Sequence, residues 1–371
     1  MKKSTHRTRA IVRKEFLHII HDPRTLFLVI MMPVVQLIMF GYALNLEIQH
    51  VNIAVIDYSK SLASRNFVQY FRGSKFFHPF FVNQNPSQVE TLFKERKAKV
   101  AVVIPADFDR ELKRNFSIPI QFLIDASDAN AATLIQNYCN QVVMNYNNDI
   151  GNKMSLPFDL RNTVYFNPNF KSSYFFVPGL IAMILIMITS LLTSVAIARE
   201  KETGTMEQIL VSPVRPHEII LGKVLPYILL SFLDASLILS IGIFLFKIPF
   251  VGSLLLLLVL SLLYIILSLS LGVLISTVAN SQQVALMIAM TATILPTIML
   301  SGLIFPIASM PKLLQYFTYL VPARFYLLIV RGIILKGSTF VQLLIPTVIL
   351  VFMTILLFTI SVKKFRVTLE E

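Results

Sequence analysis

The sequence predicts a polytopic α-helical membrane protein with six transmembrane helices and an inserted α/β extracytoplasmic domain. Its 371 residues are 55% hydrophobic and only 14% charged, with a mean hydropathy of +0.70, whereas soluble domains are about 45–50% apolar and about 25% charged. The apolar residues gather in six runs, and one segment of ordinary polarity, residues 45–173, separates the first run from the second. This composition excludes fully soluble enzymes and nucleic-acid-binding proteins.

Each of the six runs has the length of about 20 residues that a membrane-spanning helix needs. The runs are Leu26 to Leu44, Tyr174 to Ala198, Ile219 to Phe246, Phe250 to Ala279, Val284 to Phe305 and Phe340 to Val362. The third and fourth exceed the thickness of the hydrocarbon, so we expect them to tilt or protrude. No small-x-small cleavage site follows the first run, so we expect an uncleaved anchor rather than a signal peptide.

Basic residues predict that both chain ends are cytoplasmic. The leader, residues 1–25, carries seven Lys or Arg residues, and the tail, residues 363–371, carries three. Cytoplasmic segments next to spans are enriched in Lys and Arg, and two cytoplasmic ends require an even number of spans. The connector 199–218 then lies inside and residues 45–173 outside. The net charge of +13 therefore orients the protein and does not indicate a nucleic-acid partner.

Four basic residues depart from this rule, because they fall in the outer connection between the fifth and sixth runs. They are Lys312, Arg324, Arg331 and Lys336. An outer re-entrant segment over about 306–335, within the span region 174–362, would explain the stretch Pro306 to Pro322, which is partly apolar but interrupted by prolines.

The segment 45–173 alternates short apolar runs with helical stretches. The strand-like runs are Val51 to Ile56, Phe76 to Val82, Val100 to Ile104, Ile118 to Ile124 and Thr163 to Phe166. The helical stretches are Ser61 to Phe71, Ser87 to Lys97, Ala106 to Arg114 and Ala129 to Asn147. This alternation predicts crossover connections and a mixed or parallel sheet. We interpret Asp125 as a turn residue and Asp128 as a helix cap rather than as ligands.

Residues that could perform chemistry are few. The chain contains no phosphate-binding loop of the G-x-x-x-x-G-K-[ST] or G-x-G-x-x-G type. Cys139 is the only cysteine, so this chain alone cannot build a disulfide, a Cys-based zinc site or an iron–sulfur site. His18 and His21 lack a third metal ligand. We therefore expect no catalytic residue, no metal and no cofactor, and we expect that the chain is not an enzyme.

The inner connector, residues 199–218, is the most informative polar segment. The charged residues Arg199 to Glu202 leave the membrane, and Thr205 can cap a short helix over residues 206–210. Pro213 and Pro216 are expected to end that helix. A short amphipathic element between two spans could serve as the contact site for a soluble protein that drives movement of the spans. The alternative that composition leaves open is a solvated hairpin.

The leader offers a second amphipathic element. Val12, Phe16, Ile19 and Ile20 recur at helical spacing, as in a helix that lies in the membrane interface. A basic topology signal that happens to be helical remains the alternative.

Asp234 is the only acidic residue inside the six runs. An ionisable side chain at membrane depth is costly and usually faces a protein interior or a cavity. Asp234 is therefore a candidate for the lining of a translocation path or for a hydrogen bond across an interface. The alternative is a structural hydrogen bond, to Ser231, to Ser236 or to a neighbouring helix.

The connector carries a resemblance to a known family. Its residues 199–214, R-E-K-E-T-G-T-M-E-Q-I-L-V-S-P-V, and residues 218–227, E-I-I-L-G-K-V-L-P-Y, resemble the permease subunits of type-2 ATP-binding-cassette exporters. The leader and the segments L-S-G-L-I-F-P (300–306) and P-A-R-F (322–325) are similar to that family as well. The resemblance covers essentially the whole chain and points to the bacterial subgroup with a large periplasmic domain between the first two spans.

The resemblance implies a permease of the bacterial inner membrane, in an ATP-driven exporter of a drug-like, lipid-like or other amphipathic substrate. It implies a separate cytoplasmic ABC ATPase subunit, a second permease in a homo- or heterodimer, and contact with membrane lipid. Members of this subgroup also work with a periplasmic adaptor and an outer-membrane channel. The residues that match the family's ATPase-coupling segment are Glu200, Glu202, Gly204, Thr205, Met206, Glu207, Gln208 and Leu210.

Two other function classes fit parts of the sequence. An ion-coupled secondary transporter would require several intramembrane acids, where the runs supply Asp234 alone. A membrane-anchored receptor with an outer ligand-binding domain would not require five further spans. A stable complex with a nucleotide-binding subunit distinguishes the exporter from both.

Overall fold

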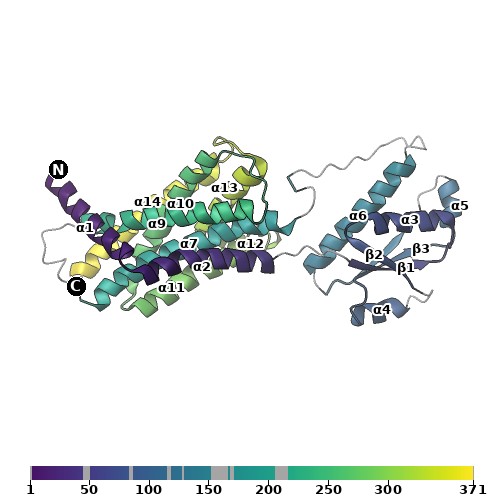
Figure 1. Ribbon diagram of the computed structural model, residues 1–371, viewed down its shortest axis with the longest axis horizontal. Helices are drawn as coiled ribbons and strands as arrows, with labels where there is room; N and C mark the ends of the chain where they lie inside the picture. Colours follow the sequence, from purple (N-terminus) through teal and green to yellow (C-terminus); the bar gives the residue numbers. More distant parts are fainter. Residues whose placement is uncertain are drawn as a thin grey trace. The chain divides into compact units, whose positions relative to one another are not determined.

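The computed structural model describes residues 2–44, 51–82, 87–114, 118–127, 129–151, 166–167, 171–204 and 216–370. The chain divides into two compact units (Figure 1). One is helical and comprises Met1–Asn45 and Lys171–Glu371, and the other is an α/β unit over Leu46–Phe170.

The α/β unit contains a four-stranded mixed sheet in the order β2-β1-β3-β4. Its strands are β1 (Val51–Asp57), β2 (Phe77–Phe81), β3 (Val100–Ile104) and β4 (Gln121–Ile124). Strand β1 pairs in parallel with β2 and β3, and β4 is antiparallel to β3. The predicted mixed sheet is therefore confirmed. Residues 163–165 of the expected fifth strand lie outside the described residues, and Phe166 is not in a strand.

Helices connect these strands and cover the sheet. They are α3 (Leu62–Gly73), α4 (Ser87–Lys94), α5 (Phe108–Lys113) and α6 (Ala129–Gly151). Side chains of α3, α5 and α6, among them Phe67, Phe108 and Tyr138, form one apolar core with β1 and β3, and α4 contributes to a smaller one. The predicted turn at Asp125 is confirmed, because its carboxylate accepts hydrogen bonds from the Ser127 backbone N–H and hydroxyl. Asp128 lies outside the described residues.

The helical unit contains the apolar runs. Its helices are α1 (Lys2–Ile20), α2 (Pro23–Ala43), α7 (Ser172–Glu202), α9 (Pro216–Phe244), α10 (Leu254–Val278), α11 (Gln282–Leu300), α12 (Lys312–Phe317), α13 (Pro322–Lys336) and α14 (Leu344–Glu370). Within the described residues, five helices are long and apolar enough to cross a membrane: α7, α9, α10, α11 and α14. The apolar part of α2, Val29–Ala43, is shorter. This content fits a polytopic membrane protein.

The segment between α11 and α14 is the one for which a re-entrant structure was expected. Helix α12, continued by the 3₁₀ turn η2 (Thr318–Leu320), meets α13 at a bend of 83°, which is the geometry of a re-entrant loop or of a broken span. If the pair counts as one span, the number of candidate spans rises from five to six. Pro322 stands in the first turn of α13, where a missing N–H removes no helical hydrogen bond.

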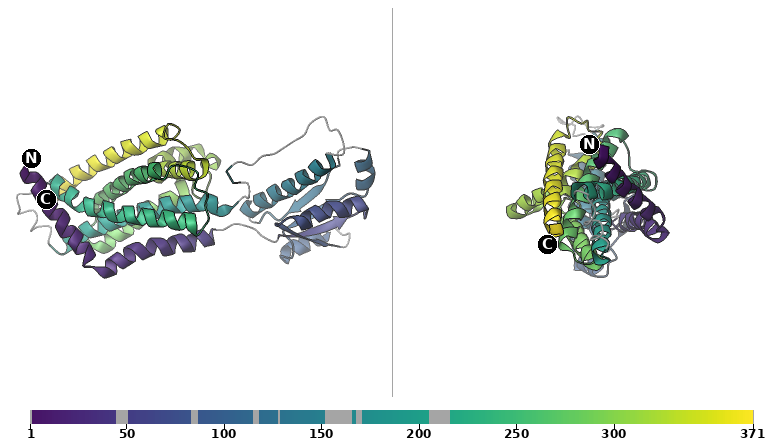
Figure 2. Two further views of the ribbon diagram at one scale, coloured as in Figure 1. Left: turned by 45° about the horizontal axis from the view of Figure 1, so that its top comes forward. Right: turned by 90° about the vertical axis from the view of Figure 1, so that its left-hand side faces the viewer.

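Helix α7 lies at the centre of the bundle, which Figure 2 shows in two further views. It packs against α2, α9, α10, α11 and α13. Of its most apolar stretch of 18 residues, 83% is buried. Gly272 of α10 permits a close approach to α7, because a β-carbon there would lie 2.5 Å from the Ser190 carbonyl oxygen. The Ser190 hydroxyl in turn donates to the Ser268 carbonyl at 3.0 Å.

Several helix ends differ from the lengths of the apolar runs. Helix α10 begins only at Leu254, because the Ser253 hydroxyl caps it by accepting from the Leu256 N–H. Helix α11 ends at Leu300, and Gly302 follows with a positive φ of 82°. The excess length of the fourth run is therefore partly non-helical rather than a protruding helix. Pro216 begins α9, in the first turn, where proline is favoured. The short helix predicted over residues 206–210, and Pro213 after it, lie outside the described residues.

Cys139 provides a test of the α/β core. The thiol lies on α6 with 1% exposure, and burial raises its pKa to about 12. Because the thiolate is the reactive form, iodoacetamide at pH 8 should alkylate the folded protein about a thousandfold more slowly than the unfolded chain, whose thiol pKa is about 8.5. Mass spectrometry with and without denaturant measures both rates, with Cys139→Ser as the blank. Equal rates would contradict this core.

Candidate functional site

The C-terminal end of α7 carries four consecutive charged residues, Arg199 to Glu202. The last carbonyls of a helix have no intrahelical partners. Here the Thr203 N–H donates to the Arg199 carbonyl at 3.0 Å, and the Thr203 hydroxyl donates to the same oxygen at 2.8 Å. Gly204 follows with a φ of 71°, in the left-handed region that glycine adopts without steric cost. The chain therefore leaves α7 through a turn that depends on Gly204.

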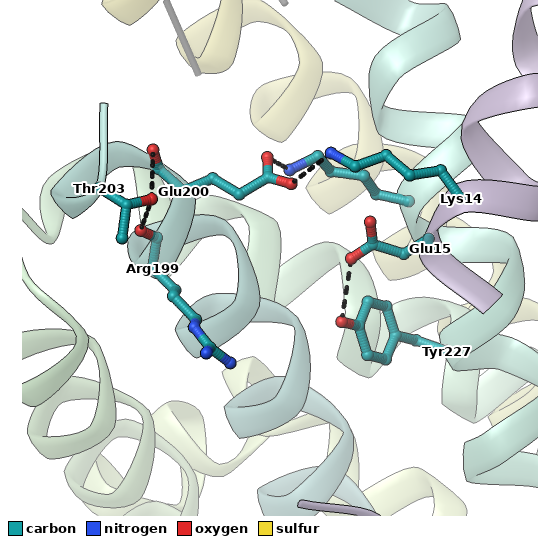
Figure 3. A network of polar contacts seen from close by, with 7 residues as sticks. Lys14, Glu15, Arg199, Glu200, Thr203 and Tyr227 are labelled. Atoms are coloured by element: carbon teal, nitrogen blue, oxygen red, sulfur yellow. Dashed lines mark hydrogen bonds and ion pairs between the residues drawn. The ribbon is translucent and has the colours of Figure 1, made fainter. Parts of the chain in front are cut away.

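Glu200 holds α7 to two other helices (Figure 3). Its carboxylate forms an ion pair with Lys223 of α9, whose side chain is only 3% exposed. Lys14 of α1 approaches the same carboxylate at 3.7 Å, and its side chain is 61% exposed. Burying a charge is costly unless it is paired, so the position of Lys223 depends on Glu200.

Lys223 is not among the residues predicted from the sequence. It is a lone cation inside the third apolar run, and the argument applied to Asp234 would have identified it, since an ionisable residue among apolar ones requires a partner.

The leader helix packs directly on α9. The Tyr227 hydroxyl donates to Glu15 Oε1 at 3.2 Å, and Glu15 is only 5% exposed. Gly222 permits this contact, because a β-carbon there would lie 2.7 Å from the side chain of Ile11. Phe16 and Ile20 of the predicted apolar stripe are exposed, and the location of this stripe in the membrane interface stays a prediction. A buried face of α1 that contains a carboxylate cannot be recognised from hydrophobic periodicity.

The other three charged residues at the end of α7 each contact a residue of another segment. Arg199 lies 3.8 Å from Asp22, between α1 and α2. Lys201 donates to the Ser276 carbonyl of α10 at 2.6 Å. Glu202 accepts two hydrogen bonds from Gln282, from its backbone N–H and its side-chain amide, both at 3.0 Å. Together with Glu200, these contacts tie the end of α7 to α1, α9, α10 and α11, so displacement of this end would be transmitted to four helices.

The structure describes only the first part of the predicted coupling segment. Glu200, Glu202 and Gly204 lie together at the end of α7. The other five predicted residues, Thr205, Met206, Glu207, Gln208 and Leu210, lie outside the described residues.

Asp234 lies apart from this cluster, 11 residues beyond Lys223 along α9, or about 16 Å at 1.5 Å per residue. It is 2% exposed. Within the described part of the chain, neither its Oδ2 atom nor the Ser231 hydroxyl has a hydrogen-bond partner. The Ser236 hydroxyl donates instead to the Phe232 carbonyl at 2.8 Å, so the alternative of an Asp234–Ser236 hydrogen bond finds no support.

The buried ion pair generates a prediction. Glu200→Gln removes the ion-pair partner of the buried Lys223 and should lower the free energy of unfolding by about 3–5 kcal/mol. Lys223→Met should lower it less, because Glu200 keeps its contact with Lys14. The double variant should lose clearly less than the sum, because neither charge remains. Melting temperatures in detergent measure the cycle, with the exposed Lys14→Gln as a control expected to change stability by at most about 1 kcal/mol. Strictly additive losses would show that the two side chains do not interact.

Asp234 generates a second prediction. The change Asp234→Asn keeps the shape of the side chain and removes its charge. Because Oδ2 has no partner among the described residues, the variant should be as stable as the parent, or more stable by about 1–3 kcal/mol. Thermal unfolding in detergent measures this, with Tyr227→Phe as a comparison in which an existing hydrogen bond is lost. A clear drop in the melting temperature of the Asn variant would reveal a structural hydrogen bond.

Comparison with known proteins assigns the chain to a family. The sequence profile of ABC-2 family transporter proteins matches residues 23–363. The "Probable multidrug ABC transporter permease YbhS" of Escherichia coli K12 is 32% identical, over 94% of this chain and 93% of its own. The corresponding YbhR is 34% identical, over 90% and 91%, and the "Inner membrane transport permease YhhJ" is 27% identical, over 85% of each chain. The chain belongs to the ABC-2 family and is the membrane permease subunit of an ABC transporter.

Proposed function

We propose that this permease exports amphipathic molecules, drug-like or lipid-like, across the bacterial inner membrane, with energy from ATP hydrolysis in a separate cytoplasmic ATPase. The similarity to YbhS and YbhR, which are described as probable multidrug permeases, supports the substrate class, and the similarity to YhhJ, an inner membrane permease, supports the membrane. The permease itself hydrolyses nothing in this proposal. It works as a dimer, either with itself or with a second permease chain.

The observation that carries this proposal is the set of contacts at the end of α7. The ATPase grips the connector, residues 199–218, and closes when it binds ATP. Because Glu200, Lys201 and Glu202 contact α9, α10 and α11, movement of the connector shifts these helices together. In this way ATP binding changes the shape of the translocation path between the two permeases. The proposed coupling residues are those of the family's motif, from Glu200 to Leu210.

The proposed topology is based on the segments that lie together at one end of the helical unit. Helix α1 and the C-terminal end of α14 lie at the same end of this unit (Figure 1), and Lys14 contacts Glu200 there. We assign this end to the cytoplasm, with the leader 1–25, the connector 199–218 and the tail 363–371. The α/β unit follows α2 along the chain, and because α2 is assigned as the first span in this proposal, we assign residues 45–173 to the outside. There it offers a surface for a periplasmic adaptor that leads to an outer-membrane channel.

The test of this proposal is purification of the tagged full-length chain from membranes in mild detergent. A nucleotide-binding subunit should co-purify in stoichiometric amount, and inverted vesicles that contain the complex should accumulate a fluorescent amphipathic dye only with ATP. Transport driven by an ion gradient without ATP would favour a secondary transporter. A ligand response without transport would favour a receptor. Either result contradicts the proposal.

The connector generates a further prediction. Gly204→Val strains a left-handed turn, and Glu207→Gln removes a charge of the coupling motif. Each should lower ATP-dependent dye transport at least tenfold while membrane insertion and ATP hydrolysis by the complex persist. The control is Gly242→Ala, since a β-carbon at Gly242 would make only ordinary contacts of 3.4 Å or more. Unchanged transport in both connector variants would exclude the coupling role.

A further inference from the structure

Lys312 and Arg324 are two of the four basic residues that depart from the charge rule for cytoplasmic segments. They lie on either side of the bend between α12 and α13. Helix α13 reaches the end of the helical unit away from Glu200, because Arg331 donates to the carbonyl of Phe175, near the start of α7, at 2.9 Å. Phe175 and Glu200 are 25 residues apart on α7, or about 38 Å. The contacts at the end of α7 therefore do not explain these cations.

Arg331 has a structural role of its own. Its guanidinium also donates to the Gly302 carbonyl at 3.1 Å and lies 3.8 Å from the centre of the Phe175 ring. These contacts join α13 to the start of α7 and to the segment after α11. Helix packing therefore accounts for Arg331.

Arg324 contacts only uncharged groups among the described residues. Its guanidinium donates to the Thr318 hydroxyl and lies 3.9 Å from the centre of the Tyr319 ring, and its Nε atom has no hydrogen-bond partner in the described part of the chain. The sequence around it offers no acid, because residues 235–369 contain neither Asp nor Glu. A hydroxyl and an aromatic ring orient a guanidinium without neutralising it. The positive charge of Arg324 therefore remains available to an anion.

The segment between the two cations is apolar and exposed. No residue of α12 is buried. Six large apolar or aromatic side chains of α12 and η2 are each at least 42% exposed, namely Leu313, Leu314, Tyr316, Phe317, Tyr319 and Leu320. A short helix that presents Leu, Phe and Tyr beside a Lys is typical of the interface between membrane and water, where Tyr is enriched.

The charges decide what covers this exposed face. A second copy of the permease, in symmetric contact through α12, would bring Lys312 and Arg324 of both chains to one interface, where neither α12 nor α13 has an acid to compensate them. A soluble anion would match the cations and leave the apolar side chains in water. A phospholipid with a negatively charged headgroup matches both, because its acyl chains cover the apolar face and its phosphate lies beside the cations.

We infer that residues 312–324 bind anionic phospholipid at the interface between membrane and water. The headgroup lies beside Lys312 and Arg324, and the acyl chains lie on the exposed face of α12 and η2. This binding depends neither on the proposed transport activity nor on the side of the membrane to which α12 belongs. It gives two of the exceptional basic residues a partner from outside the chain.

The absence of Trp from the sequence permits a direct test, because Tyr316→Trp places a single fluorophore on the exposed face of α12. The full-length variant is reconstituted in vesicles of phosphatidylcholine and phosphatidylglycerol, of which one lipid carries bromine on its acyl chains and quenches nearby Trp fluorescence. Exchanging the brominated lipid gives the relative affinity of the two lipids at this position. Phe352→Trp, at an exposed apolar position of α14, is the reference.

Phosphatidylglycerol should be preferred at least fivefold at the Tyr316→Trp position, because each cation near an anionic lipid contributes about fivefold in affinity. Adding Lys312→Gln should lower this preference at least twofold, and adding Arg324→Gln as well should abolish it. The matched control is the pair Arg72→Gln and Lys75→Gln, which removes two exposed cations of the α/β unit and should leave the preference unchanged. Lys312 is exposed, so its variant tests the inference even if Arg324→Gln fails to fold, which melting temperatures establish.

Equal affinity of the two lipids at the Tyr316→Trp position, or a preference that Lys312→Gln leaves unchanged, would overturn the inference. Quenching by neither lipid would overturn it too, since protein rather than lipid would then cover α12. The Phe352→Trp reference should be quenched equally by both lipids. A phosphatidylglycerol preference of the same size there would also contradict the inference, because the preference would then belong to the whole lipid-facing surface.

Discussion

The burial of charge at the end of α7 is the constraint on which the arrangement of the helical unit depends. A cation such as Lys223, almost without exposure, would destabilise the fold severely if unpaired, so α9 must lie where Glu200 reaches it. The half-buried Lys201 and the exposed Glu202 add hydrogen bonds to α10 and α11. Apolar packing alone would leave the relative positions of these helices less defined, since one apolar surface packs on another in many ways. The charged contacts select one arrangement.

This constraint also joins the connector to a cavity of about 380 Å³ inside the helical unit. Arg199 and Glu200 belong both to the end of α7 and to the wall of the cavity. Glu15 of the leader helix also lines this cavity, and the neighbouring Lys14 approaches Glu200 at 3.7 Å. A displacement of the connector therefore changes the polar surroundings of any occupant. Reciprocity of binding free energies then requires that an occupant alter the equilibrium of the connector. The end of α7 and the cavity wall therefore share side chains, without a long path between them.

The α/β unit is held together by a different kind of contact. Its core is a sheet covered by helices, with stacked and edge-on aromatic contacts such as Phe76–Tyr138 and Phe67–Phe71. The separate cores of the two units agree with the boundaries seen in the composition. Local patterns were sufficient for most of this unit, because runs such as Val100–Ile104 are short, apolar and bounded by turn residues, and the strand has the same limits in the structure.

The sequence by itself determined the class of protein, the apolar helices, the alternating elements of the inserted unit and the family, because these depend on composition, periodicity and contiguous motifs. Only the tertiary structure decided that Glu15 is buried against Tyr227, 212 positions away, that Lys223 pairs with Glu200, and that Phe16 and Ile20 are exposed. The physical reason is that a local pattern records how apolar a face is. The partner of a buried charge is set by distant helices that meet only in the folded chain.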